Sequence, residues 1–363
     1  MAHDVAIVGG GPAGSVAAYR LATAGVRVLV VDKATFPRDK PCGGGVTGRA
    51  ARLLPFSIDP VVEDVADRMD CGLRYRHRIT RRARGPLAYM TQRKRLDHFL
   101  LQKAAGAGAE VREGVTVDAR ELEARIVIGA DGCNGSSAKQ LGLAQGIVHG
   151  VALEANYPWE ERFAGGMLLE IAIIQGGYGW IFPKGDHINV GVGGNEDEGP
   201  RLRAELRRMC EAWGIDPDAA TDTRGYRLPM RLRGTALARG TTAVIGDAAG
   251  LVDPFSGDGM YEAFYSAKLV TEAALDVLAG RSENLDGYQR AVESRIMPLT
   301  RAGWGAKRAF ERFPRTTYAI ARLPITFRVL EKLLTGDLPE PAAARGVEKA
   351  AIRAIYRVAK HAS

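Results

Sequence analysis

The sequence has few cysteines and no long apolar run. Its 363 residues include four cysteines, and no two of them form a CxxC pair. This spacing argues against a zinc site or a disulfide framework and fits a reducing compartment. No apolar stretch approaches the roughly 20 residues of a membrane-spanning helix, and residues 1–4 lack the basic segment of a secretory signal peptide. We therefore expect a cytoplasmic protein, with peripheral attachment to a membrane as the alternative.

Positive charge is concentrated towards the C-terminus. The formal net charge is +8, and the residues from 300 onward carry thirteen Lys/Arg against five Asp/Glu. Within residues 347–360, apolar and basic side chains fall on different faces of an expected helix. Such a helix either packs on the body of the protein with its basic side in solvent or rests on anionic lipid. Nucleic acid is not expected as a partner, because the tail lacks the row of interleaved aromatic residues that base stacking requires.

The order of expected elements predicts an α/β fold with an inserted second lobe. Residues 4–8 and 26–31 are expected to form buried parallel strands around a helix over residues 15–23. From about residue 147 to 198 the pattern changes to alternating strands punctuated by glycine, which predicts a mostly antiparallel sheet. Buried-strand character returns at residues 241–246 and is followed by a long helix. The chain past residue 280 is expected to be helical.

This order divides the chain into three expected regions. They are a discontinuous Rossmann-like cofactor domain (1–75, 90–145 and 241–300), a β-sheet substrate domain (76–89 and 146–240) and a basic helical C-terminal region (301–363).

A glycine fingerprint lies between the first strand and its helix. Gly9, Gly11 and Gly14 form G-x-G-x-x-G at this turn. The first glycine permits the sharp turn, the second lets a pyrophosphate approach the backbone, and the third lets the helix pack against the strand. Asp32 ends the second strand, where a carboxylate accepts hydrogen bonds from ribose hydroxyls. Strand, turn, helix, strand and acid in this order predict a dinucleotide-binding unit.

Two later segments favour FAD as the dinucleotide. Residues 126–135 (IVIGADGCNG) and 243–259 (AVIGDAAGLVDPFSGDG) each contain a buried strand that ends near an aspartate, Asp131 and Asp247. Ribityl hydroxyls are suitable partners for such carboxylates, and the glycine-rich helix start after the second strand suits the N1–C2=O2 edge of a flavin. Either aspartate alone is equally typical of an ordinary helix-capping turn. Together with the glycine fingerprint, the two segments predict FAD.

These segments resemble the flavoproteins with a para-hydroxybenzoate hydroxylase type of FAD domain, in which they surround one extended FAD. Arg93, in R-x-x-L-D-x-x-L, matches a helix start of that class. The resemblance implies that Arg93 lies near the phosphate or ribityl side of the flavin, the alternative being a surface arginine.

Two further stretches are similar to the geranylgeranyl reductase family, flavoenzymes that hydrogenate isolated C=C bonds in prenyl chains. Residues 38–45 read RDKPCGGG, and residues 178–183 read YGWIFP. The similarity spans residues 4 to about 300, and PCGGG is its most specific part. The family's sheet motif begins with a proline that is Gln175 here.

The resemblance implies hydride transfer from reduced flavin N5 to one alkene carbon and proton delivery to the other. It implies catalytic roles for Cys42, Tyr178 and Trp180, whose alternatives are a small buried hydrophobe and plain sheet core. The two aromatic residues alternate along a strand with Phe182 and are expected to share one face. The residues expected to bind FAD are Gly9, Gly11, Pro12, Ala13, Gly14, Asp32, Lys33, Arg38, Cys42, Gly43, Gly44, Arg93, Asp131, Gly246, Asp247, Pro254, Gly257, Gly259 and Met260.

The implied partners are a prenyl lipid or another apolar isoprenoid, with possible membrane-surface contact through the basic C-terminus. NAD(P)H and ferredoxin are both open as electron donors, because the chain has no second dinucleotide fingerprint. Alternative functions are a flavin-dependent monooxygenase or halogenase acting on an aromatic substrate, and a non-catalytic electron-transfer or lipid-binding flavoprotein. The halogenase motif W-x-W-x-I-P differs here in its first tryptophan and its isoleucine.

Overall fold

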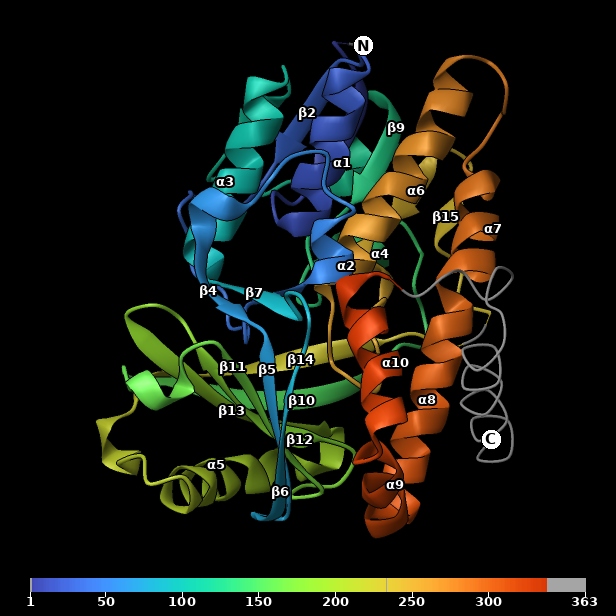
Figure 1. Ribbon diagram of the computed structural model, residues 1–363. Coiled ribbons are helices and arrows are strands. Elements are labelled where there is room, and N and C mark those ends of the chain that lie inside the picture. The colour runs from blue at the N-terminus through green and yellow to red at the C-terminus, as the bar shows by residue number, and fades with distance from the viewer. Residues whose placement is uncertain (1, 233, 338–363) are drawn as a thin grey trace.

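The computed structural model contains two large sheets of different construction, with a column of helices along one side (Figure 1). It describes residues 2–232 and 234–337. The basic helix expected over residues 347–360 therefore lies outside the described residues.

The first sheet is the parallel sheet that the βαβ pattern predicts. Its strands run in the order β15-β16-β9-β1-β2-β8, and every neighbouring pair except β15 with β16 is parallel. The bounds are β1 (His3–Val8), β2 (Val28–Val31), β8 (Glu110–Arg112), β9 (Ala124–Gly129), β15 (Ala238–Arg239) and β16 (Thr242–Val244). Helix α1 (Pro12–Thr23) contacts both α3 (Arg93–Gly106) and α6 (Met260–Leu278). Helix α1 begins three residues before the predicted start, because Pro12 is well suited to the first helical turn.

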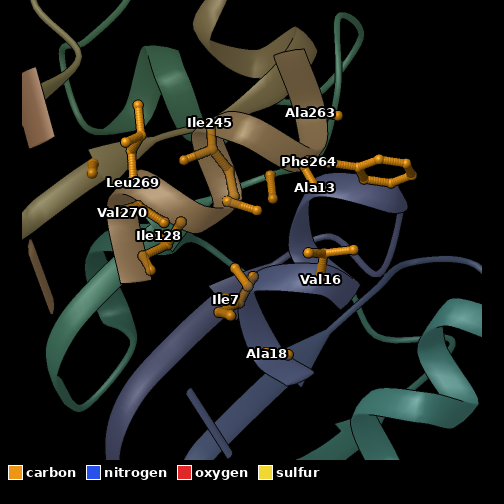
Figure 2. Close-up of a cluster of buried hydrophobic side chains, with 14 of the residues drawn as sticks. Ile7, Ala13, Val16, Ala18, Ile128, Ile245, Ala263, Phe264, Leu269 and Val270 are labelled. Atoms are coloured by element: carbon orange, nitrogen blue, oxygen red, sulfur yellow. The ribbon is translucent and has the colours of Figure 1, made fainter. Parts of the chain in front are cut away.

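One apolar cluster holds this layer together. Figure 2 shows Ile7 of β1, Val16 of α1, Ile128 of β9, and Phe264 and Val270 of α6 in this cluster. All five side chains are fully buried, and complete burial of one such side chain contributes about 1.5–3 kcal/mol. The cluster therefore fixes the carboxyl ends of β1 and β9, where the predicted cofactor residues begin, beside the start of α6.

The second sheet has seven strands in the order β14-β10-β13-β12-β11-β5-β6. Its bounds are β5 (Arg68–Leu73), β6 (Arg76–Arg82), β10 (Val148–Pro158), β11 (Gly166–Ile171), β12 (Tyr178–Pro183), β13 (His187–Asn195) and β14 (Thr221–Met230). Every pair is antiparallel except β5 with β11, which confirms a mostly antiparallel lobe. Helix α5 (Leu202–Ala212) contacts β10 and β13. The apolar cluster that joins this helix to the sheet leaves the other sheet face free to line a cavity.

No individual strand is predicted at β5 or β6, although β6 lies within residues 76–89, which are expected in the β-sheet substrate domain. Strand β6 reads RHRITRR, and its side chains are mostly exposed, so it carries little apolar periodicity. Arginine-rich edge strands of this kind resist pairing with other chains. The position of β5 also places residues 68–73 in the second sheet, although we had grouped them with the cofactor segments.

A small sheet and a helical column complete the described chain. The sheet has the order β3-β7-β4 and bridges the two lobes; its bounds are β3 (Gly45–Thr47), β4 (Val62–Ala66) and β7 (Ala88–Thr91). The remaining α-helices are α2 (Gly48–Ala51), α4 (Ser137–Gln140), α7 (Asp286–Arg295), α8 (Met297–Arg312), α9 (Pro314–Ala321) and α10 (Pro324–Thr335). The helical character predicted past residue 280 is thus confirmed as far as Thr335, and α8 to α10 stand beside the seven-stranded sheet (Figure 1).

Candidate cofactor and substrate site

A single cavity of about 2290 Å³ runs from the carboxyl ends of β1 and β2 to the space between the seven-stranded sheet and helices α8 to α10. Its volume exceeds the roughly 300–1,000 Å³ of an ordinary small-molecule site. The cavity therefore has room for an extended dinucleotide and for a second ligand. Among the predicted cofactor and catalytic residues, all line it except Gly14 and Gly246, which are buried packing points beside it.

The glycine turn after β1 has the geometry that the fingerprint predicts. Gly9 has a φ of 109°, and a Cβ there would lie 2.5 Å from the carbonyl oxygen of Ala130. A Cβ at Gly14 would collide with the carbonyl oxygen of Gly9. At Gly11 a Cβ would meet only the Arg38 guanidinium, at 3.5 Å. Two glycines are therefore needed for chain packing, whereas the middle one leaves open space in front of α1.

The start of α1 is arranged to receive an anion. No side chain caps its N-terminus, and its first turn contains no acidic residue. Free N–H groups and the helix dipole give this end a partial positive charge. Asp32 follows β2 beside the turn, and its carboxylate accepts hydrogen bonds from the N–H groups of Gly10 (2.7 Å) and Ala34 (2.8 Å). These bonds hold the carboxylate at the cavity wall.

Asp131 lies where predicted, just past β9, but its carboxylate is occupied within the chain. It accepts hydrogen bonds from the N–H groups of Ser136 (2.8 Å) and Ser137 (2.9 Å) and from the Ser137 hydroxyl. This arrangement is the helix-capping turn that was the alternative for Asp131. The side chain shapes the loop before α4, and the loop itself forms part of the cavity wall.

Asp247 belongs to a polar group that the sequence analysis did not identify. Its Oδ2 accepts hydrogen bonds from Lys40 Nζ (3.1 Å) and from the Tyr226 hydroxyl (3.2 Å). Burial opposes ionisation of Asp247, but the Lys40 ammonium and the Arg93 guanidinium hold its pKa below the ordinary value. Lys40 lies inside the RDKPCGGG stretch, so a signal for it was present. Tyr226 comes from β14, and no motif marks it.

Arg93 is a buried residue, which rules out the alternative of a surface arginine. Its side chain is 5% exposed, and its guanidinium donates two hydrogen bonds of 2.7 Å to the Asp97 carboxylate. Arg38 Nη1 also pairs with Asp97, at 2.9 Å. Burial works against the charge on Arg93, but Asp97 raises the pKa of the guanidinium. Asp97 thus holds two predicted cofactor residues at one place in the cavity wall.

The loop before α6 forms another part of the cavity wall at the cofactor end. Pro254, Gly257, Gly259 and Met260 all face the cavity. The Tyr178 hydroxyl donates a hydrogen bond to the Ser256 carbonyl oxygen in this loop. One predicted catalytic residue is therefore tied directly to a predicted flavin-binding loop, from a different sheet.

Tyr178, Trp180 and Phe182 of β12 share one face of the strand, as expected, and the PCGGG loop lies against this face. Their ring centroids are 6.2 Å apart for Tyr178 and Trp180 and 6.4 Å apart for Trp180 and Phe182. A Cβ on Gly43 would lie 3.0 Å from the Phe182 ring and 3.3 Å from Trp180 Nε1. The Trp180 Nε1 donates to Asn189 Oδ1 at 2.8 Å, which fixes the ring. Cys42 is half-buried and lines the cavity beside these rings.

Beyond the aromatic row the cavity becomes apolar. Its walls there include Met69 of β5, Met167 and Leu169 of β11, and Phe327 and Leu330 of α10. We call this part the apolar arm. Its residues come from segments up to 261 positions apart in sequence, from Met69 to Leu330, and no local motif predicts them.

Two charged residues near Cys42 were also missed. Glu154 of β10 accepts a hydrogen bond from the Cys42 N–H at 2.6 Å, and Lys184 directly follows the YGWIFP motif. The position of Lys184 next to that motif was an available signal, whereas nothing in the sequence around Glu154 marks it.

The residues at the cofactor end fit FAD. The open space at Gly11 in front of an uncapped helix start suits a pyrophosphate. Polar groups continue along the wall from Asp32 through Arg93 to Asp247, and the cavity then opens beneath the PCGGG loop. Within the described residues, no cluster of His, Cys, Asp or Glu has the arrangement of a metal site. None of the described helices is long and apolar enough to cross a membrane.

Comparisons with known proteins agree with this geometry. Residues 2–57 match the FAD binding domain family. The chain is 31% identical to menaquinone reductase of Mycobacterium tuberculosis over 92% of each chain. It is 28% identical to geranylgeranyl diphosphate reductase of Rhodobacter capsulatus, over 77% of this chain and 76% of the other.

Solved structures give the same fold. A geranylgeranyl bacteriochlorophyll reductase-like protein from Thermoplasma acidophilum superposes with a TM-score of 0.75 at 21% identity, covering 98% of this chain and 95% of the other. Flavin-dependent halogenases and monooxygenases share the fold at 16–22% identity. These structures support the architecture, and the sequence relatives carry the family assignment.

Proposed function

Because this chain belongs to the geranylgeranyl reductase family of FAD-dependent oxidoreductases, we propose that it reduces C=C bonds in a prenyl chain carried by a lipid or another isoprenoid. The observation that carries the proposal is the continuity of the cavity. One space joins the cofactor end to the apolar arm, and Cys42 with the aromatic row lies at their junction. A site of this shape suits an extended hydrocarbon whose reacting bond is held next to a flavin.

The chain's own residues have distinct proposed tasks. The glycine turn, Asp32 and the Arg93–Asp97 pair hold FAD, which when reduced supplies a hydride from N5. An isolated alkene has no polar group to activate, so positioning contributes much of the catalysis. Tyr178 and Trp180 hold the chain in place from the aromatic face. The Cys42 thiol gives the proton that completes the reduction.

The substrate class follows from the walls of the apolar arm. The relatives are named for menaquinone and for geranylgeranyl diphosphate, so the head groups that accompany the prenyl chain differ widely among them. In this chain the apolar arm accepts hydrocarbon, and we propose no single head group. For the electron donor we propose NAD(P)H or ferredoxin.

We further propose that the protein works at the cytoplasmic face of a membrane, through the end of the helical column. Phe313, Ile320, Leu323 and Ile325 are 57%, 52%, 48% and 45% exposed. Residues 312–330 contain four arginines and no acidic residue. Ile320 and Ile325 also line the cavity, so the apolar arm opens at this surface. We call residues 312–325 the apolar–basic tip.

The tip lies against a second basic segment. The single Tyr318 hydroxyl hydrogen is shared between the carbonyl oxygens of Cys71 and His77, and Arg81 Nη2 donates to the Arg322 carbonyl oxygen at 2.9 Å. These bonds join α9 to the arginine-rich strand β6. Exposed apolar side chains with arginines around them suit binding to the surface of an anionic bilayer. A prenyl lipid in that bilayer would then enter the apolar arm from the tip.

The reaction is tested with FAD-loaded protein reduced chemically without oxygen. We expect the flavin absorbance near 450 nm to return when a prenyl compound is added, and each reduced bond to add two mass units to the product. The panel contains geranylgeranyl diphosphate and a digeranylgeranyl phospholipid, each in detergent, because neither carries a quinone ring that would itself oxidise the flavin.

The saturated analogue of each compound is the control, because it binds the same walls but offers no alkene. Reoxidation by saturated analogues, or absence of product across the panel together with rapid oxygenation or halogenation of phenols, contradicts the proposal. FAD retention and lipid binding without any turnover indicate the non-catalytic alternative.

A further inference from the structure

Lys184 is a buried cation without a matching carboxylate. The residue is 3% exposed, and its ammonium donates a hydrogen bond to the Thr91 carbonyl oxygen at 2.7 Å. Among the described residues, no carboxylate forms an ion pair with it. A buried ammonium without a paired anion is costly and is typical of functional sites. Burial lowers the pKa of Lys184, and Cys42, Glu154 and Asp39 act in the opposite direction.

The ammonium lies against the backbone that also contacts the Cys42 sulfur. Gly44 has a φ of 69°, and a Cβ at this position would collide with Lys184 Nζ and with the Thr91 carbonyl oxygen. The Gly44 N–H in turn donates to Cys42 Sγ at 3.3 Å. The missing side chain of Gly44 therefore lets the ammonium approach the loop, and the Gly44 N–H holds the Cys42 sulfur against the same residue.

The other charges around Cys42 are already paired or have the opposite sign. The Arg93 charge is neutralised by its two hydrogen bonds to Asp97. Glu154 binds the Cys42 N–H and is not within ion-pair distance of Lys184; burial raises its pKa, and the Lys184 ammonium acts in the opposite direction. Asp39 forms an ion pair with Arg224 at 2.8 Å. The remaining titratable neighbour is Tyr178, whose pKa is raised by burial. Among the described residues around Cys42, Lys184 is thus the cation not held in an ion pair.

We propose that Lys184 is a positioning residue whose ammonium stabilises the Cys42 thiolate that forms when the thiol protonates the substrate. In this step the Cys42 S–H bond breaks, its electron pair stays on sulfur, and a C–H bond forms on the alkene carbon that did not receive the hydride. The reduced flavin loses two electrons and the alkene gains them. The thiolate then regains a proton from solvent before the next turnover.

The catalytic meaning of this inference rests on the proposed alkene reduction, but the charge pairing can be measured without any substrate. The thiolate is the form of cysteine that iodoacetamide alkylates. Cys42 is followed by peptide mass spectrometry in the FAD-loaded oxidised protein between pH 6 and 9. Burial raises the pKa of Cys71 to about 12 and of Cys133 to about 11, so these thiols serve as slow internal references.

We expect Lys184→Met to slow alkylation of Cys42 about tenfold at pH 7 and to move its pH–rate profile to higher pH. The reason is that a nearby opposite charge shifts such an equilibrium by about 1–3 pH units. Lys184→Gln should behave in the same way. Lys307→Met is the matched control, because Lys307 is another buried lysine, which donates to the Gly176 carbonyl oxygen and pairs with Glu311 at 3.7 Å.

An unchanged Cys42 profile in both Lys184 variants overturns the inference, and so does an equal shift in Lys307→Met. A variant that does not retain FAD is compared with wild-type apoprotein, because the contacts among Lys184, Gly44 and Cys42 involve protein atoms only. The two proposals fail separately. If the profile shifts but no prenyl compound is reduced, the pairing stands and the proposed function falls; if prenyl chains are reduced and the profile does not shift, only the role of Lys184 falls.

Discussion

At the cofactor end of the cavity the wall combines glycine backbone with polar side chains, whereas in the apolar arm it is made of apolar side chains. Gly9, Gly11 and Gly14 admit almost no alternative residue, because added atoms meet carbonyl groups or fill the space for a ligand. In the arm, Leu169 and Phe327 contribute only apolar volume, and swaps that conserve volume usually cost less than about 1.5 kcal/mol. The same cofactor end can therefore serve enzymes with different substrates, since the arm can change without disturbing it.

The largest expected effect is that of a substitution in the glycine turn. Gly14→Val places a side chain against the Gly9 carbonyl oxygen and the Ala130 side chain, so α1 cannot pack against the turn. We expect the protein to be purified without FAD and to show no absorbance near 450 nm, even after incubation with excess FAD.

Gly106→Val is the matched control for this substitution. It makes the same chemical change at the end of α3, where a Cβ has no neighbour within 4 Å. This variant should remain yellow. Full FAD content in Gly14→Val would show that the glycine turn does not bind the cofactor. The cofactor end would then tolerate substitution as readily as the apolar arm.

A smaller effect is expected at the junction between the two ends. Cys42→Ala should lower the rate of anaerobic flavin reoxidation by a prenyl substrate about 100-fold, because general acids typically contribute about 10²–10⁴-fold. FAD content should be unchanged, since the Cys42 contact to Glu154 is made by the backbone N–H. Stopped-flow absorbance gives the rate, and the absorbance ratio of flavin to protein gives the content.

Cys210→Ala is the control for this prediction, because Cys210 is buried in the cluster between α5 and the seven-stranded sheet. Its turnover should equal that of the wild type. Equal turnover in Cys42→Ala would instead return Cys42 to the alternative of a small buried residue and would require another proton donor.

The cofactor end of the cavity could be predicted from the sequence much better than the apolar arm could. Residues fixed by the local order of strand, turn and helix carry a local signature, so the turn at Gly9, the acid that follows β2 at Asp32 and the aromatic face of β12 were all predictable. The fold class followed from the order of strand patterns. Asp131 shows the limit of this reasoning: the motif placed it correctly, but its carboxylate is used to cap α4.

Residues that act through contacts between distant segments were not predictable. Glu154 meets Cys42 across 112 positions, and the Lys184 ammonium meets Thr91 across 93. Strand β5 joins β11 after an interval of about a hundred residues, and its edge partner β6 has too many arginines for a period-two apolar signal. Such contacts depend on the packing of the whole fold, and a single sequence does not encode them in a local pattern.

The smallest effect is expected where the arm meets the surface. In Phe313→Ser/Leu323→Ser, two exposed apolar residues of the apolar–basic tip become polar. Neither residue lines the cavity, so catalysis on detergent-dispersed substrate should be unchanged. Binding to vesicles that contain anionic lipid should weaken about tenfold, because each buried apolar side chain contributes about 1.5–3 kcal/mol when fully inserted and partial insertion gives less. Turnover of a prenyl lipid held in those vesicles should fall several-fold.

Vesicle flotation measures this binding, and Val65→Ser is its control. Val65 is 41% exposed on β4, which lies beside α3 and β7, away from α9 (Figure 1). Raising the salt concentration should weaken binding of the wild type and of Val65→Ser alike, because the arginines around the tip act through screened charge. If the double variant floats as well as the wild type, the arm receives its substrate from elsewhere, and the tip is only the outer surface of the helical column.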